Sequence, residues 1–147
     1  MKKITLILLT IILAACTGAS EYDQNLAKWQ AADVSHYRYD LFIGCFCPFA
    51  EDMPLTVEVL NGEIVSITSA DGSPVEATDP SRGVYESYAT IDRLFAELET
   101  DLSGEADEVV VTYDPTYGFP VNIAIDQIKE AIDDELSLQV SNFEILE

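Results

Sequence analysis

The chain has 147 residues, of which 27 are acidic and seven basic, so its formal net charge at pH 7 is −20. A charge of this sign and size repels nucleic acid and anionic lipid, which excludes both as direct partners. Apolar residues make up 48% of the chain, enough for one domain with a buried core.

Residues 1–15 have the layout of a secretory signal peptide. Two lysines precede an apolar run, Ile4–Leu13, and small residues follow it before Cys16. A run of this length spans only about 15 Å as a helix, roughly half a bilayer core, so a retained transmembrane helix is disfavoured. We therefore expect the leader to be removed, which takes two basic residues away and leaves a net charge of −22.

The residues around the expected cleavage point, Leu13-Ala14-Ala15-Cys16, resemble a bacterial lipobox. The resemblance implies that Cys16 carries a diacylglyceryl thioether, begins the mature chain and holds it at the membrane, with residues 16–25 as a tether. Because Thr17 follows the cysteine, the resemblance implies the periplasmic face of the outer membrane if the source is Gram-negative. The alternative is ordinary cleavage beside a stray cysteine.

Residues 26–147 are predicted to form a single α+β domain. Apolar residues recur at helical spacing over 23–33, which predicts a helix that buries Trp29. Apolar and polar residues then alternate over 37–43, the period of a half-buried strand, and the pattern continues through two cysteines.

A hairpin around Asn61-Gly62 is predicted over residues 55–68. A three-residue loop that pairs Val57 with Val65 collects the apolar side chains on one face, so we prefer it to a two-residue turn. The stretch that follows, residues 69–87, contains glycines and prolines with little periodicity and is predicted to be a long loop.

The second half is predicted to repeat the order of the first. Apolar spacing predicts a helix over 91–102 with Thr90 as its N-cap. A hairpin follows over 109–125, then a short helix from Asp126 through Ile132.

A final strand is predicted over residues 138–146, with a bulge near Ser141 because the inward parity changes there. The expected fold is therefore α+β: two helices packed on a mainly antiparallel sheet, with the order helix plus three strands repeated twice.

Several short motifs are spread over this layout. They are Trp29, Tyr37-Arg38-Tyr39, Cys45-Phe46-Cys47-Pro48, Asn61-Gly62, Ile91-Asp92-Arg93-Leu94-Phe95, Tyr113-Asp114, Gly118-Phe119-Pro120 and Asp126. Together they resemble the bacterial domain-of-unknown-function 6174 family over most of the chain after Cys16. The resemblance implies a small exported domain, often lipid-anchored, and supplies no catalytic residues.

Cys45 and Cys47 are the two cysteines left after the lipobox, in a compartment that oxidises thiols. Alpha carbons two apart in a regular strand lie about 6.6 to 6.8 Å apart, so a disulfide requires a bend, which Gly44 and Pro48 permit. The pair is either structural, or it acts in redox chemistry or metal binding. Reactive cysteines need electropositive surroundings, so the second alternative requires them here. Zinc is poorly supported, because it takes four Cys or His ligands and only His36 could add to the pair.

Four acidic residues around the second hairpin, Asp114, Asp126, Asp133 and Asp134, are candidates for a divalent cation site, because hard cations take several oxygen ligands. No loop has the EF-hand spacing, and these residues serve equally well as turn formers and caps. Hydrolase motifs such as G-x-S-x-G and H-E-x-x-H are absent from the sequence. No catalytic residue and no cofactor are predicted.

These observations favour a lipid-anchored cell-envelope protein that acts as a non-enzymatic binding or assembly module. Its expected contacts are the membrane, through the lipid on Cys16, and a basic envelope protein or a divalent cation, because the domain is strongly acidic. Two alternatives stay open. One is a thiol-redox protein that uses Cys45 and Cys47, and the other is a divalent-cation-binding envelope protein.

Overall fold

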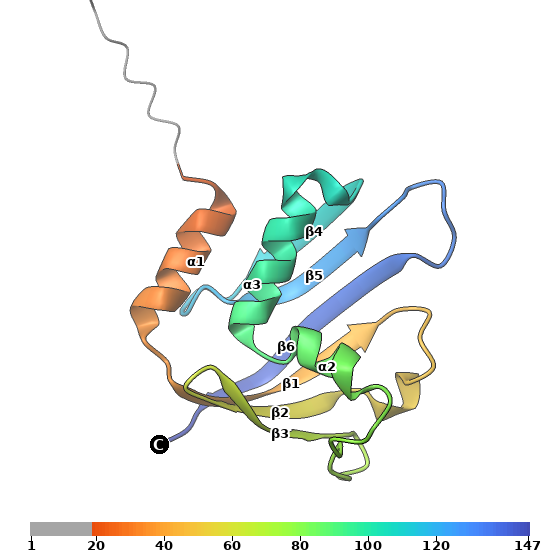
Figure 1. Cartoon of the computed structure of the whole chain (residues 1–147). Coiled ribbons are helices and arrows are strands. Elements are labelled where there is room, and N and C mark those ends of the chain that lie inside the picture. Colours follow the sequence, from red (N-terminus) through yellow and green to blue (C-terminus); the bar gives the residue numbers. More distant parts are fainter. Residues whose placement is uncertain (1–18) are drawn as a thin grey trace, which may run out of the picture.

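The computed structural model describes residues 19–147, so the signal peptide and the lipidation residue Cys16 lie outside the described residues. The described part forms a six-stranded antiparallel sheet, in the order β3-β2-β1-β6-β5-β4, with three α-helices on one face (Figure 1). The elements are α1 (Glu21–Ala32), β1 (His36–Gly44), η1 (Ala50–Asp52), β2 (Leu55–Leu60), β3 (Glu63–Thr68), α2 (Arg82–Tyr88), α3 (Ile91–Thr100), η2 (Asp101–Glu105), β4 (Glu108–Tyr113), β5 (Pro120–Asp126) and β6 (Glu135–Ile145).

The core lies between the sheet and the helices. Strand β1 is central, and its side chains alternate between buried and more exposed along its length, as the sequence pattern predicts. Helix α3 contributes four buried apolar side chains, whereas α1 buries only Trp29. Helix α1 therefore depends on a few contacts to hold it on the sheet.

Local sequence explains where the two longer helices begin. Ser20 and Asp23 form a capping box at the start of α1, each accepting a backbone hydrogen bond from the other. The side chain of Thr90 accepts from the backbone N–H of Arg93 and caps α3, which confirms the predicted N-cap.

The predicted order of two helices and three-strand repeats is wrong. A third helix, α2, lies within the stretch predicted to be a loop over residues 69–87 and extends to Tyr88. It buries Tyr85, whose ring packs edge-on against Phe49 and whose hydroxyl donates to Asp52 at 2.5 Å. A seven-residue helix with one buried side chain has too little periodicity to be recognised in the sequence.

The helix predicted after Asp126 is also wrong. Residues 127–134 form turns and bends, in which the Ile128 N–H donates to Asp134 and Asp133 has a φ of 73°. The side chain of Ile132 is 86% exposed. Without a surface to cover, the isoleucines here do not stabilise a helix.

The predicted register of the first hairpin is corrected too. Asn61 and Gly62 form a two-residue turn with φ of 52° and 79°, so Val59 pairs with Ile64, and beyond a shift in register Val57 pairs with Ile67. A bulge at Val65 restores the inward direction of Ile67, which the prediction achieved with a longer loop. The bulge predicted near Ser141 is confirmed, because the β1–β6 register shifts next to that residue.

Candidate functional site

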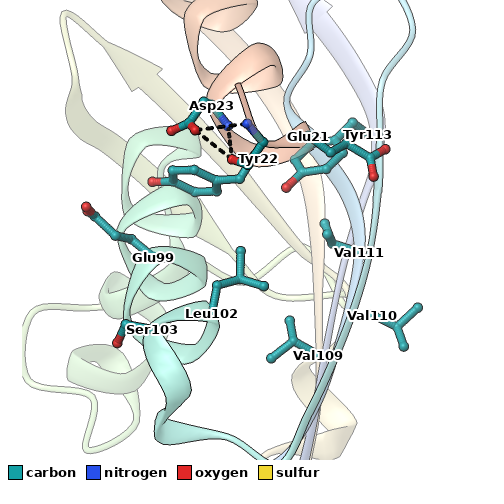
Figure 2. A pocket seen from close by; sticks show the side chains of 11 residues that line it. Glu21, Tyr22, Asp23, Glu99, Leu102, Ser103, Val109, Val110, Val111 and Tyr113 are labelled. Carbon is teal, nitrogen blue, oxygen red and sulfur yellow. Dashed lines mark hydrogen bonds between the residues drawn. The ribbon is translucent and has the colours of Figure 1, made fainter. Parts of the chain in front are cut away.

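An open groove of about 750 Å³ lies between the start of α1, the end of α3 and strand β4 (Figure 2). Its lining is more apolar than polar. The residues around it are Ser20, Glu21, Tyr22, Asp23, Glu99, Leu102, Ser103, Val109, Val110, Val111 and Tyr113.

The groove exists because α1 and α3 both stop short of covering β4. Val109 and Val111 point toward the helices, since they pair with the buried residues Ile125 and Ile123 of β5, yet they stay only half-buried. Leu102, just after α3, is 47% exposed in the part of the groove opposite them. The apolar floor is thus left open to solvent.

Tyr22 holds the wall of the groove that α1 contributes. Its ring meets Phe95 of α3 edge-on, with centroids 5.7 Å apart, and its hydroxyl donates to the Phe95 carbonyl at 3.1 Å. Burial, followed by the charges of Glu99 and Asp23, raises the pKa of Tyr22. The side chain therefore stays a neutral donor that joins the two helices.

Tyr113 lies on the other side of the groove and stacks with Phe95 at a centroid distance of 6.3 Å. Burial, with the nearby Glu21 carboxylate as the next cause, raises the pKa of Tyr113 to about 12. Its hydroxyl oxygen is buried and has no hydrogen-bond partner within residues 19–147.

The two edge strands of the sheet differ in how they are protected. Beside β3, the chain returns after Gly72: Thr68 forms a bridge with Pro74, and Val75 N donates to the Ile67 carbonyl at 2.9 Å. Strand β4 pairs with β5 on one side, and no described segment pairs with its other side. An apolar edge strand left open in this way invites pairing with another chain.

The mouth of the groove is acidic. Glu21, Asp23 and Glu99 line it, and within the described chain no lysine, arginine or histidine does. Asp23 is engaged in the capping box of α1, and the charges of Glu21, Asp23 and Glu99 all reach the tyrosines of the groove. The groove accordingly suits an apolar ligand that carries positive charge.

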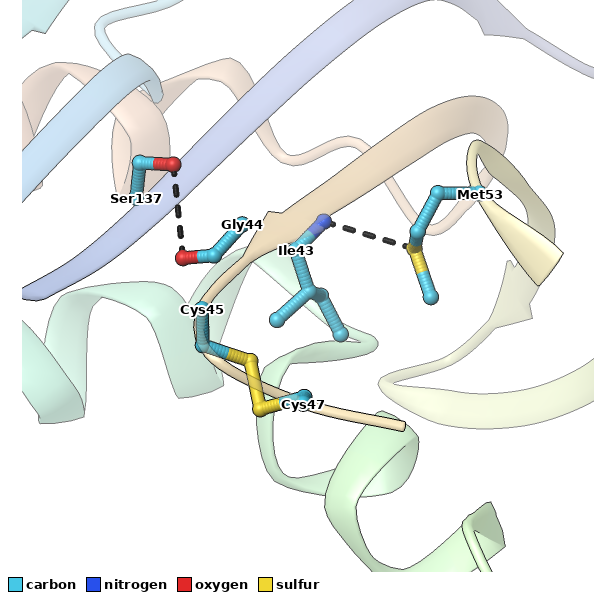
Figure 3. The surroundings of a disulfide bond; sticks show 6 residues. All are labelled: Ile43, Gly44, Cys45, Cys47, Met53 and Ser137. Atoms are coloured by element: carbon cyan, nitrogen blue, oxygen red, sulfur yellow. Dashed lines mark hydrogen bonds between the residues drawn. A yellow bond between two sulfur atoms is a disulfide. The ribbon is translucent and has the colours of Figure 1, made fainter. Parts of the chain in front are cut away.

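Cys45 and Cys47 form a disulfide at the end of β1 (Figure 3). Their alpha carbons lie 5.2 Å apart, shorter than in a regular strand, because the chain bends after Gly44 and Cys47 N donates to the Cys45 carbonyl at 2.8 Å. A side chain at Gly44 would lie 2.3 Å from Ser137 Oγ, so a larger residue there would collide with β6.

The surroundings of this disulfide favour a structural bond. The hollow beside it, of about 300 Å³, is lined by Glu97, Asp133, Asp134 and Glu135, and no basic residue of the described chain lines it. Carboxylates oppose thiolate formation, whereas reactive cysteines need electropositive surroundings.

The four acidic cation candidates are not brought together. Asp114 accepts backbone hydrogen bonds from Thr116 and Tyr117 in the β4–β5 turn. Asp126 ends β5 at the opposite end of that hairpin, near Asp134. Across residues 19–147 there is no cluster of three or more side chains arranged to hold a metal ion.

Family comparison agrees with the motifs noted in the sequence. The model of a family of unknown function, DUF6174, matches residues 21–145. The chain belongs to this family. No curated protein and no solved structure gives a significant match. No helix within residues 19–147 of this DUF6174 protein is long and apolar enough to cross a membrane.

Sequence reasoning missed the groove of this DUF6174 domain. The run Val109-Val110-Val111 has no charged residue within it. Such an apolar strand needs another segment to cover it, and this is the signal in the sequence that could have indicated the groove. The strand order places β4 at the edge of the sheet, and sequence periodicity does not reveal that order.

Proposed function

We propose that the protein is a lipid-anchored, non-enzymatic binding module of the cell envelope. The observation that carries this proposal is the open groove between α1, α3 and β4, whose apolar floor is unpartnered and whose mouth is acidic. Apolar pockets with a few charged groups at the rim are the usual form of binding sites. Membership of a family of unknown function does not conflict with this proposal and adds no support to it.

The lipid anchor is the part of this proposal that sets where the groove works. Cys16 is four residues before Ser20, a distance of at most about 14 Å even for a fully extended chain. Since Ser20 lines the groove, a lipid on Cys16 would keep the groove close to the membrane surface. The net charge of −22 after removal of the leader would not hold an anionic membrane, so attachment rests on the acyl chains.

Membrane fractionation of a Cys16→Ser variant tests the anchor. We expect the wild-type chain in the membrane fraction and the variant in the soluble fraction, with the same tryptophan emission as the wild type. A variant that stays membrane-bound would refute the lipid anchor, whereas the binding role of the groove does not depend on this result.

Photocrosslinking in intact cells tests the binding role. A photoreactive amino acid at Leu102, inside the groove, should give a discrete adduct, whereas the same amino acid at Val65, 54% exposed on β3, should not. Equal adducts from both positions, or none from Leu102, would count against a binding module that uses this groove.

Thiol-redox chemistry is a second candidate, supported by the Cys45–Cys47 disulfide. Its carboxylate-lined surroundings place it behind the binding role. Alkylation of the folded protein in cells distinguishes the two functions: a redox protein shows a reduced fraction that changes with oxidant, and a structural bond does not.

A further inference from the structure

We propose that the free edge of β4 and the groove beside it bind an extended polypeptide segment in which basic and apolar residues alternate, added to the sheet as a seventh strand. This inference deepens the proposed binding function and rests on it. It names the chemistry of the partner and the way in which the partner is held.

The first step is the backbone. Strand β4 is six residues long, β-branched at four positions, and lacks a pairing partner within the described chain on its outer side. Natural edge strands are blunted by lysine, proline or a covering segment. Strand β3 has such a cover in Pro74 and Val75, whereas β4 contains neither lysine nor proline. An added strand would satisfy the backbone groups of β4 along its length.

The second step is the apolar half of the ligand. Alternate side chains of an added strand point to opposite faces of the sheet. Those on the helix side would enter the groove, where Leu102, Val109 and Val111 are incompletely covered. The groove runs beside β4 from Val109 to Tyr113, so it faces two or three such side chains (Figure 2).

The third step is the basic half. Side chains on the other face would meet a smaller hollow of about 360 Å³, lined in part by Glu108, Asp126 and Glu135. Burial raises the pKa of Asp126, and the charges of the neighbouring carboxylates Asp134 and Glu135 raise it further. Lys129 offsets some of this charge through its 3.1 Å ion pair with Glu108. Cationic side chains of the ligand therefore fit both this face of the sheet and the acidic mouth of the groove.

Charge also decides among the possible occupants. A second copy of this chain, paired edge to edge through β4, would bring two strongly acidic molecules together, each with a net charge of −20, with Glu108 at the junction. An acidic segment would meet the same repulsion. A segment with alternating basic residues is attracted instead.

The test uses the full chain, purified in a neutral detergent, and a synthetic eight-residue peptide of alternating lysine and valine. Calorimetry should show one-to-one binding that weakens as salt is raised. A glutamate-valine peptide should bind at least about tenfold more weakly. So should a lysine-valine peptide N-methylated at every second residue, because it cannot form the backbone bonds. Equal binding of all three peptides would overturn the proposal.

Two exposed valines, one on each edge strand, provide matched variants. Val65 and Val110 are both 54% exposed, so a lysine reaches solvent at either position, and each substitution adds one positive charge. Val110→Lys should weaken binding about tenfold or more by protecting the edge, whereas Val65→Lys should stay within twofold of wild type. Equal effects of the two variants would contradict binding at β4.

A second pair separates loss of binding from loss of fold. Leu102→Ser should weaken binding roughly fivefold, and Leu60→Ser, at a similarly exposed leucine on β2, should not.

If Leu102 forms a specific crosslink in cells but the peptide does not bind, the binding role stands and the peptide chemistry is wrong. If the chain dimerises and Val110→Lys makes it monomeric, the occupant is a second copy and the proposal is overturned.

Discussion

The indole Nε1 of Trp29 donates a hydrogen bond to the Oδ1 of Asp92, 3.0 Å away, and so joins α1 to the first turn of α3. Trp29 is only 5% exposed, and its ring meets Tyr37 and Phe119 edge-on. Together with the Tyr22–Phe95 contact, this bond holds α1, which forms one wall of the groove, against α3.

Asp92→Ala should lower the free energy of unfolding by about 1 to 3 kcal/mol, because it leaves a buried indole N–H without an acceptor. Asp92→Asn should lose less, since its amide oxygen still accepts. Urea unfolding followed by the fluorescence of Trp29, the chain's single tryptophan, measures both variants. An alanine variant as stable as wild type would show that the bond does not hold α1.

Gly118→Ala should destabilise the protein more than Gly72→Ala. Both glycines have positive φ, 82° and 88°, so either alanine costs about 1 kcal/mol in backbone strain. At Gly118, however, the new Cβ would lie 2.6 Å from the Asn25 carbonyl oxygen in α1, whereas at Gly72 nothing lies within 4 Å. We expect a further loss of about 1 to 3 kcal/mol at Gly118. Equal melting temperatures would contradict this packing of α1.

Replacing Cys45 and Cys47 together by serine should cost about 1 to 2 kcal/mol, the loop-closure contribution expected for a bond that spans so few residues. The variant should still fold and bind the lysine-valine peptide, because the hollow beside the disulfide and the groove beside β4 share no lining residue. Chemical denaturation and calorimetry measure the two effects. Loss of peptide binding in a folded variant would link the disulfide to the groove.

Alkaline pH should unfold the domain through its buried tyrosines. Burial is the main cause that raises the pKa of Tyr37 to about 12 and the pKa of Tyr39 well above its ordinary value of 10. The folded state therefore holds phenolic protons that the unfolded state releases. The stability from these groups is complete below pH 10 and is lost as pH rises from 10 toward 12. Melting temperatures that stay constant from pH 9 to pH 12 would contradict this.

How far the sequence predicts the structure depends on whether a pattern is local. Alternation along β1 and the N-cap of α3 follow from neighbouring residues, and both are confirmed. Helix α2 is different, because it is defined by Tyr85 contacting Phe49 and Asp52 far away in the chain. The turn over 127–134 is the converse case: two isoleucines at helical spacing found no surface to cover.

The candidate site shows the same limit. Cys45 and Cys47 are predicted as a pair because they are the two cysteines left after the lipobox and lie two residues apart, and the structure joins them in a disulfide. The groove joins Tyr22, Leu102 and Val109, which meet only once the strand order puts β4 at the edge. Asp114 and Asp126, grouped by sequence, end at opposite ends of one hairpin.

Amide hydrogen exchange on the full chain, with and without the lysine-valine peptide, tests the central claim most directly. We predict that the alternate amides of β4, residues 108–113, that face away from β5 exchange rapidly in the free protein and become protected when the peptide is added, while those of β3, residues 63–68, keep their rates. Protection of β3 instead, or unchanged exchange in β4 at saturating peptide, would contradict strand addition at this edge.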